Sequence, residues 1–210
     1  QAAIDAVSGT GDTLWFPPGQ FNYDTTLVFK NNCRYVGAGK RATTLMYTGN
    51  GDGVQVNNPI NSSTVADIYI SDIGFRCNGA ATNGKANFVD TGSTYLVIER
   101  CLFYGQRIGM ILDQTEIAAF RNNEFLFGGS AQSFGVWIIN GTSRTPAVIQ
   151  GYTNRLTFDC NQFNGDAQGV GICDDGGIDL VYLGNNFNAG SVHMRLCDVL
   201  NFNIIGGEYE

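Results

Sequence analysis

One aromatic residue returns at a nearly constant interval along most of this chain, each time as the last residue of a similar six-residue phrase. The intervals are 28, 22, 38, 24 and 22 residues, and the aromatic residues are Phe75, Phe103, Phe125, Phe163, Phe187 and Tyr209. A repeat of roughly 20–50 residues is typical of a solenoid, in which each unit buries its apolar face only against its neighbours. The interval therefore predicts a stack of similar coils, and it indicates which side chains of different coils share a face.

Each coil is expected to contain three short strands. Five and seven residues before the aromatic residue stand apolar residues, as Phe120 and Ala118 do before Phe125. A spacing of two is typical of the inward face of a strand. A further strand follows each aromatic residue after a short loop, as in residues 135–138. Three short strands in each of about seven or eight coils predict an all-β fold, a three-sided parallel β-helix.

The bend between the first two strands of a coil is marked by asparagine. Asn123, Asn161 and Asn185 stand two residues before the aromatic residue in three successive repeats. Asparagine tolerates the left-handed backbone angles of a tight corner. Stacked asparagine side chains can also hydrogen-bond to one another and to the backbone of the turn. We therefore expect a ladder of asparagines along this corner of the solenoid.

The 210 residues suffice for one sizeable core, and we expect a single domain over residues 1–210. Residues 1–8 predict a short helix that caps the first coil, because an open coil would expose unpaired backbone. The long interval of 38 residues contains a loop insertion at residues 140–154. The sequence ends in mid-strand at Glu210, so we expect the domain to belong to a longer chain.

Charge and hydropathy exclude some classes of partner. The net charge of −7 argues against nucleic acid, and no apolar run approaches the roughly 20 residues of a membrane span. The six cysteines lack the spacing of a zinc site, and we expect buried thiols. A disulfide between Cys173 and Cys197, on neighbouring coils, is the alternative for that pair.

The first fifty residues resemble the entry region of the pectate-lyase-like superfamily of right-handed parallel β-helices. The resemblance lies in a capping helix at residues 1–6, the Phe-Pro-Pro-Gly phrase within residues 12–21, the Val-Gly-Ala-Gly turn ending at Gly39, and Thr43-Thr-Leu45. It is closest to phage tailspike depolymerases and secreted polysaccharide lyases and hydrolases. The resemblance implies a polysaccharide substrate, an extracellular or virion-surface location and, for a tailspike, a homotrimer. The superfamily also includes non-catalytic spikes, so the fold does not fix a reaction.

Two sets of catalytic phrases known in this superfamily are incomplete or absent. The polygalacturonase-like pattern is matched only by Asp174-Asp175 and by His193 with Arg195, without its Asn-Thr-Asp phrase or the glycines around the histidine. The Asp-Pro-His-Glu phrase of the epimerases is absent. Any catalytic residues of this chain are therefore not those of either group.

The resemblance places the ligand cleft along the third strand of each coil. Counting from the aromatic residues, we expect Ile111, Trp137, Gly171 and His193 at successive outward positions of these strands. An outward tryptophan exposes apolar surface unless something covers it, and the C–H face of a sugar ring is a natural cover. Gly171 would leave open space beside Trp137. The alternative is that the loop at residues 140–154 folds back over the indole.

Carboxylates stand where the third strands end. Asp113 and the pair Asp174 and Asp175 are expected about two coils apart, roughly 9.6 Å, at the upper edge of the separation found in inverting glycosidases. His193 is a candidate general base or hydrogen-bond donor to sugar hydroxyls. The alternative for Asp174-Asp-Gly-Gly177 is an ordinary turn.

The sequence also offers candidates for contact with an acidic substrate and for binding a metal ion. Arg144 and Arg195 are the candidates for contact with a substrate carboxylate. No cofactor is expected for a hydrolase, whereas a lyase would call for calcium, to which Asp174, Asp175 and Asp179 could contribute oxygen ligands. No other metal site is expected.

Two further columns of charged residues are interpreted as structural. Glu99, Arg121 and Asp159 lie four residues before successive aromatic residues and predict an ion-pair ladder. Glu124 begins a column expected to form a solvated polar edge. The sequence as a whole favours a β-helix that binds and degrades a polysaccharide, and the alternative is a non-catalytic spike or adhesin forming a trimeric shaft.

Overall fold

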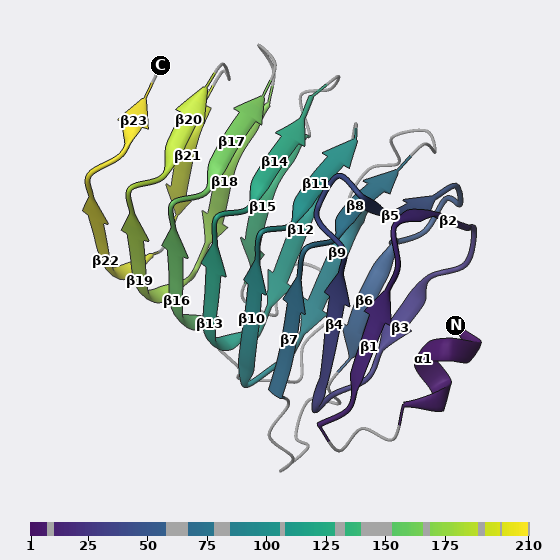
Figure 1. Cartoon of the computed structure of the whole chain (residues 1–210). Helices are drawn as coiled ribbons and strands as arrows, with labels where there is room; N and C mark the ends of the chain where they lie inside the picture. The colour runs from purple at the N-terminus through teal and green to yellow at the C-terminus, as the bar shows by residue number, and fades with distance from the viewer. Residues whose placement is uncertain are drawn as a thin grey trace.

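The chain forms a right-handed parallel β-helix with a short N-terminal helix (Figure 1). The computed structural model describes residues 1–7, 11–57, 67–77, 85–105, 108–128, 133–139, 153–165, 169–188, 192–197 and 199–209. The described strands pair only in parallel, each with the equivalent strand one coil away, in three sheets. Eight successive coils are described, which confirms the three-sided solenoid predicted from the repeat.

The three sheets are named here A, B and C. Sheet A comprises β1 (Thr13–Phe16), β4 (Cys33–Gly37), β7 (Asp67–Ser71), β10 (Tyr95–Glu99), β13 (Glu116–Arg121), β16 (Asn154–Asp159), β19 (Ile178–Leu183) and β22 (Leu200–Ile205). Sheet B comprises β2 (Gly19–Tyr23), β5 (Thr43–Tyr47), β8 (Gly74–Cys77), β11 (Leu102–Gly105), β14 (Glu124–Phe127), β17 (Gln162–Gly165), β20 (Asn186–Asn188) and β23 (Glu208–Tyr209). Sheet C comprises β3 (Leu27–Phe29), β6 (Val54–Asn57), β9 (Ala86–Thr91), β12 (Ile108–Asp113), β15 (Phe134–Ile139), β18 (Val170–Asp175) and β21 (Val192–Cys197).

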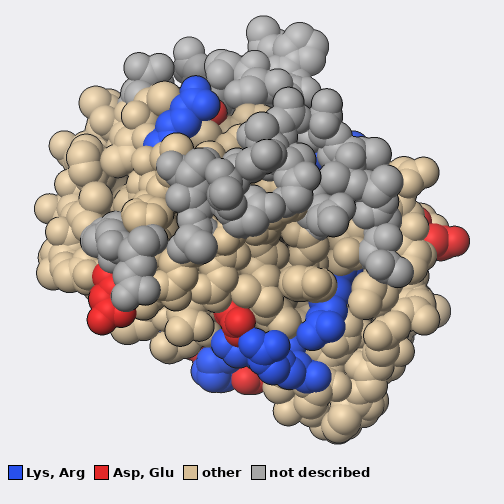
Figure 2. Space-filling view, turned by 90° about the horizontal axis from the view of Figure 1, so that it is seen from above, with Lys and Arg blue, Asp and Glu red and all other residues tan. Residues whose placement is uncertain are grey.

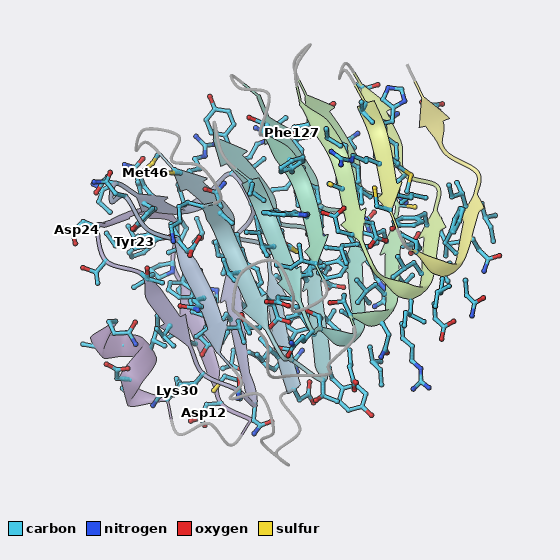
Figure 3. All side chains as sticks on the ribbon, turned by 180° about the vertical axis from the view of Figure 1, so that it is seen from behind. Asp12, Tyr23, Asp24, Lys30, Met46 and Phe127 are labelled. Atoms are coloured by element: carbon cyan, nitrogen blue, oxygen red, sulfur yellow. The ribbon has the colours of Figure 1, made fainter. Side chains whose placement is uncertain are left out.

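The helix α1 (Ala2–Ala6) covers the first coil, as the capping prediction requires. Ile4 is 2% exposed and belongs to the main core. Lys30, which lies beside the helix (Figure 3), donates from Nζ to the carbonyl oxygens of Asp5 at 2.6 Å and Val7 at 2.8 Å. Both carbonyls lie at the C-terminal end of the helix, so the lysine ties the cap to the solenoid.

The recurring aromatic residues form a continuous stack inside the solenoid. Ring centroids lie 5.1, 4.9, 4.8 and 4.7 Å apart along the series Phe75, Phe103, Phe125, Phe163 and Phe187. None of these side chains is more than 1% exposed. The spacing equals the distance between neighbouring strands, so one ring per coil fills the core without a gap.

The asparagine ladder is present and fully buried. Asn123 donates from Nδ2 to Oδ1 of Asn161 at 3.1 Å, and Asn161 donates to Oδ1 of Asn185 at 3.0 Å. Each Nδ2 also donates at 2.9 Å to a carbonyl of the preceding coil, such as that of Phe120. The left-handed residue of the corner is, however, the one before the asparagine, for example Asn122 at φ 54°. The prediction of the ladder is confirmed, and the predicted position of the left-handed angle was wrong by one residue.

All six cysteines are free thiols, and four of them are buried as predicted, whereas Cys160 is exposed and Cys197 is half-buried. The alternative, a disulfide between Cys173 and Cys197, does not form. Strand register explains why: Cys173 lies opposite Arg195, and Cys197 lies opposite Asp175. The two sulfur-bearing residues are therefore diagonal neighbours, about 7–8 Å apart, beyond the usual span of a disulfide.

The charged columns differ in part from the prediction. Glu99, Arg121 and Asp159 occupy one column of sheet A, but Glu99 forms its ion pair with the adjacent Arg100. Glu124 is 7% exposed rather than solvated, because Lys40 and Arg41 bind its carboxylate at 3.3 and 2.8 Å.

On the face drawn in Figure 2, basic side chains lie near acidic ones, further acidic side chains lie apart at the edges of the view, and most of the described surface is uncharged. The ion pairs given above belong to the scaffold and lie outside the candidate site.

Candidate functional site

The candidate site lies on the outer face of sheet C, where side chains of β15, β18 and β21 point away from the core. On β15, Val136 and Ile138 point inward and are fully buried in the main core. Trp137 and Ile139 alternate with them and point outward, as successive residues of a strand must. Trp137 is half-buried.

Register places Trp137 opposite Cys173 on β18, and Cys173 opposite Arg195 on β21. The expectation that Gly171 and His193 follow Trp137 was therefore wrong by two residues along each strand. Loops of unequal length separate the recurring aromatic residue from the third strand of each coil. A fixed offset from the aromatic residue therefore does not give the register of the third strand, which is set by backbone pairing.

Gly171 leaves no open space, because the aromatic stack fills it. A Cβ at this position would lie 2.8 Å from a ring carbon of Phe187 and 2.5 Å from the carbonyl oxygen of His193. Gly109 and Gly135 stand at the equivalent places of earlier coils against earlier rings of the stack. His193 packs its half-buried ring on Phe187, with centroids 5.9 Å apart. The histidine thus lies at the aromatic stack rather than beside Trp137.

The centre of the site is a hydrogen bond between Trp137 and Asp175. Nε1 of Trp137 donates to Oδ2 of Asp175 at 2.9 Å across neighbouring strands. The Phe134 ring packs against the indole, with centroids 5.7 Å apart. This bond fixes the orientation of the indole plane. The sequence did not indicate it, because the two residues are 38 positions apart and only their register brings them together.

Arg195 and Cys173 surround this pair. Arg195 is exposed, and a hydrogen bond with Cys197, followed by the charges of nearby acidic groups that include Asp175, raises the pKa of its guanidinium. Burial, aided by the charge of Asp175, raises the pKa of Cys173 to about 12. Cys173 is therefore a neutral thiol at neutral pH and not a nucleophile.

Asp113 occupies the same outward column as Asp175, two strands away. Ile139 stands between them in the register, so the separation is about 9.6 Å, twice the spacing of strands. The register therefore has the two residues two coils apart, as expected from the sequence. Asp113 is 7% exposed, which makes it the more buried of the two.

Asp174 points into the interior and does not face the site. It is fully buried, accepts a hydrogen bond from the amide of Gly177 at 2.8 Å and faces the Tyr182 hydroxyl at 3.4 Å. Burial raises its pKa to about 6. The expectation that both aspartates border the cleft is thus contradicted for Asp174, and the alternative of a turn-stabilising residue fits its contacts.

Asp90 repeats this arrangement and was not singled out from the sequence. It is fully buried at the same inward position of β9, where Oδ2 accepts a 2.5 Å hydrogen bond from Thr115 and Oδ1 accepts one from Ser93. Burial raises its pKa to about 6 as well. The sequence does contain a pattern that could have revealed this, since Asp90 and Asp174 both begin an Asp-x-Gly phrase at the end of a third strand.

Apolar side chains next to the site are buried on the outer face of sheet C. Val89, Ile111 and Ile139 are 3% exposed or less, and Trp137 packs against their cluster. The continuous apolar run of residues 108–112 signals this burial, because a strand covered on both faces loses the alternation of a half-exposed one.

Some predictions fall outside the described residues. Arg144 and residues 140–152 of the insertion are among them, so the covering of Trp137 by this loop stays a prediction. Within the described ranges, no group of three potential metal ligands occurs. The helix that the structure describes is also too short to cross a membrane.

Comparison with known proteins bears on the fold. No protein-family model matches the chain, and no curated protein matches its sequence. Among solved structures, ORF18 of Geobacillus virus E2 is similar over 93% of this chain, with a TM-score of 0.57 and 16% identity. The chain spans 44% of the length of that phage protein. The A-module of the mannuronan C-5 epimerase AlgE4 from Azotobacter vinelandii aligns over the whole chain and 92% of the module, with 12% identity and a TM-score of 0.35, too low for an argument.

Proposed function

We propose that this parallel β-helix binds an extracellular polysaccharide on the outer face of sheet C and hydrolyses it there. The observation that carries the proposal is the hydrogen-bonded pair of Trp137 and Asp175 with the exposed Arg195 beside it. The likeness to the phage protein supports the fold, and it is consistent with an extracellular or virion-surface location.

Binding follows from the chemistry of these three side chains. An indole held by its Nε1 offers a rigid apolar face, on which the C–H face of a sugar can pack. The carboxylate of Asp175 has about four acceptor positions, so its bond to Trp137 leaves capacity for a sugar hydroxyl. Arg195 supplies N–H donors for hydroxyls or for a substrate carboxylate.

Cleavage is assigned to Asp113 and Asp175. Their separation of about 9.6 Å lies at the upper edge of the roughly 6.5–9.5 Å of inverting enzymes and is far from the roughly 5 Å of retaining ones. Asp113, the more buried group, acts as the acid and protonates the glycosidic oxygen. Asp175 accepts a proton from the water that attacks the anomeric carbon, and the C–O bond to the leaving sugar breaks.

The test begins with a panel of neutral and acidic polysaccharides, measured by affinity electrophoresis and by release of reducing ends. Trp137→Ala should weaken binding at least tenfold. Asp175→Asn should slow cleavage by about 10²–10⁴-fold, the contribution typical of a general base. Tyr104→Ala and Asp24→Asn, which change an exposed aromatic residue and an exposed carboxylate elsewhere, are the matched controls.

Three outcomes are informative. Equal loss in the site variants and the controls, or no loss in either, would contradict the proposed site. Binding that depends on Trp137 without any release of reducing ends would retain the binding function and overturn hydrolysis. In that case the chain serves as a polysaccharide-binding spike.

A further inference from the structure

A surface hollow lies on the outer face of sheet A, at the N-terminal end of the solenoid. Its volume of about 440 Å³ falls within the range of about 300–1,000 Å³ usual for small-ligand sites. The residues that matter for its chemistry are Asn32, Arg34, Asp67, Tyr69 and Val97. They come from the second, third and fourth coils, whose strands β4, β7 and β10 run side by side in Figure 1.

Strand register builds this hollow from outward-facing side chains. Arg34, Tyr69 and Val97 form one column on β4, β7 and β10. Asp67 begins β7 and lies opposite Tyr95 of β10. Tyr69 and Val97 therefore form an apolar floor, while Arg34 and Asp67, both exposed, form polar walls.

The floor and one wall are held in place by direct contacts. The Arg34 guanidinium lies over the Tyr69 ring, 4.6 Å from its centroid. The Tyr69 hydroxyl donates to Glu99 at 2.5 Å, and this bond, followed by Arg100, lowers the pKa of Glu99. Arg100 in turn binds Asp72 at 2.8 Å. A ligand would meet groups that are already oriented, so little entropy is lost when it binds.

Two exposed aromatic side chains flank the hollow. Trp15 on β1 is 55% exposed and lies opposite Val36, two residues along β4 from Arg34. Tyr95, beside Asp67, is 44% exposed. Neither aromatic ring is needed for the core, and neither is explained by the site on sheet C.

We propose that the hollow at Arg34, Asp67 and Tyr69 binds a neutral saccharide, independently of the site on sheet C. The C–H faces of the sugar would pack against Val97 and the flanking rings of Trp15 and Tyr95, because the Arg34 guanidinium already lies over the Tyr69 ring. Asp67 would accept hydrogen bonds from sugar hydroxyls, and Arg34 would donate to hydroxyl or ring oxygens.

The local charge selects a neutral ligand over an acidic one. At the hollow itself Asp67 stands against Arg34, and beside it Arg100 and Arg121 offset Asp72 and Glu99, so the surroundings offer an acidic ligand no net attraction. Arg100 is already bound to two of the carboxylates. A uronic acid chain or a nucleic acid would face repulsion from Asp67 at the wall of the hollow.

The two tryptophans of the chain allow the two sites to be tested separately. Trp137→Phe leaves Trp15 as the only indole, next to the hollow. We expect saturable changes in its emission on titration with at least one of a set of neutral oligosaccharides, namely cello-, malto-, manno- and xylo-oligosaccharides. Adding Asp67→Ala to this variant should weaken the response at least tenfold, whereas adding Tyr104→Ala should not. Oligogalacturonate should give a weaker response than the best neutral ligand.

The inference is overturned if Trp15 responds to none of these oligosaccharides, if Asp67→Ala leaves the affinity unchanged, or if oligogalacturonate binds more tightly. Urea unfolding of the Asp67 variant excludes loss of structure as the cause of weaker binding. The outcome does not depend on the proposed binding at Trp137, because that indole is absent from the protein tested and Trp15 reports only on its own surroundings.

Discussion

Replacement of Asn161 by alanine should be among the most destabilising single substitutions in this chain. Asn161 is fully buried, and its side chain takes part in four hydrogen bonds. Its Oδ1 accepts from the backbone N–H and the Nδ2 of Asn123, and its Nδ2 donates to Phe120 and Asn185. Alanine would leave the backbone N–H of Asn123 without its acceptor and its Nδ2 with only the carbonyl of Ile98, and the carbonyl of Phe120 would lose this donor.

Each buried polar group left unsatisfied costs about 1–3 kcal/mol, so we expect a loss of about 3–5 kcal/mol. That is a large fraction of a typical folding free energy of about 5–15 kcal/mol. Equilibrium urea unfolding, followed by circular dichroism and by tryptophan fluorescence, measures the loss.

Asn164→Ala is the matched control for this prediction. Asn164 lies in the same coil, is half-buried, and accepts one hydrogen bond, from Asn188 at 3.1 Å. Its loss should cost about 1 kcal/mol or less. A loss below about 1 kcal/mol for Asn161→Ala, or equal losses for the two variants, would refute the claim that the ladder stabilises the corner.

Two further predictions concern buried groups near the candidate site. The raised pKa of about 6 for Asp90 and Asp174, against about 3.9 in an unfolded chain, means that the folded state binds more protons between pH 4 and 6. Stability should therefore fall as pH rises through this window, by about 3 kcal/mol for each carboxylate. Asp174→Asn keeps an acceptor for Gly177 and should remove the part of this pH dependence that is due to Asp174. The prediction is wrong if the free energy of unfolding, measured in urea, differs between pH 4.5 and 7.5 as much in the variant as in the parent protein. Gly171→Ala should cost about 1–3 kcal/mol because its Cβ would meet Phe187 and the backbone of His193, and an unchanged Tm would show that the ring stack yields easily.

The repeating elements of this fold could be predicted because each depends on local pattern. One phenylalanine per coil is enough to predict the ring stack, and asparagine at a fixed offset is enough to predict the ladder. Parallel register between adjacent coils then follows, since any slip would separate the rings or break the ladder.

The candidate site was less predictable because it depends on loops of unequal length. The pairing of Trp137 with Asp175 spans the irregular coil, where the count from the aromatic residue no longer gives the register of the third strand. The orientation of Asp174 was missed for a related reason. Two adjacent aspartates on a strand must face opposite sides, and only one of them can reach a ligand.

The hollow on sheet A also could not be predicted from the sequence. Arg34, Asp67 and Tyr69 form no motif in the sequence, and Arg34 is 35 residues from Tyr69. Their juxtaposition arises because equivalent strands of successive coils lie side by side. A solenoid thus assembles binding surfaces from residues that share a column rather than a segment.

The measurement that tests the account most directly is the fluorescence of Trp137 as the only indole, in the Trp15→Phe variant, during titration with a polysaccharide that the protein binds. We predict a saturable change in Trp137 emission that Asp175→Asn weakens at least tenfold, while Asp24→Asn leaves it unchanged. A Trp137 emission that stays constant while the polysaccharide binds would show that the ligand lies elsewhere, and it would contradict the assignment of function to the outer face of sheet C.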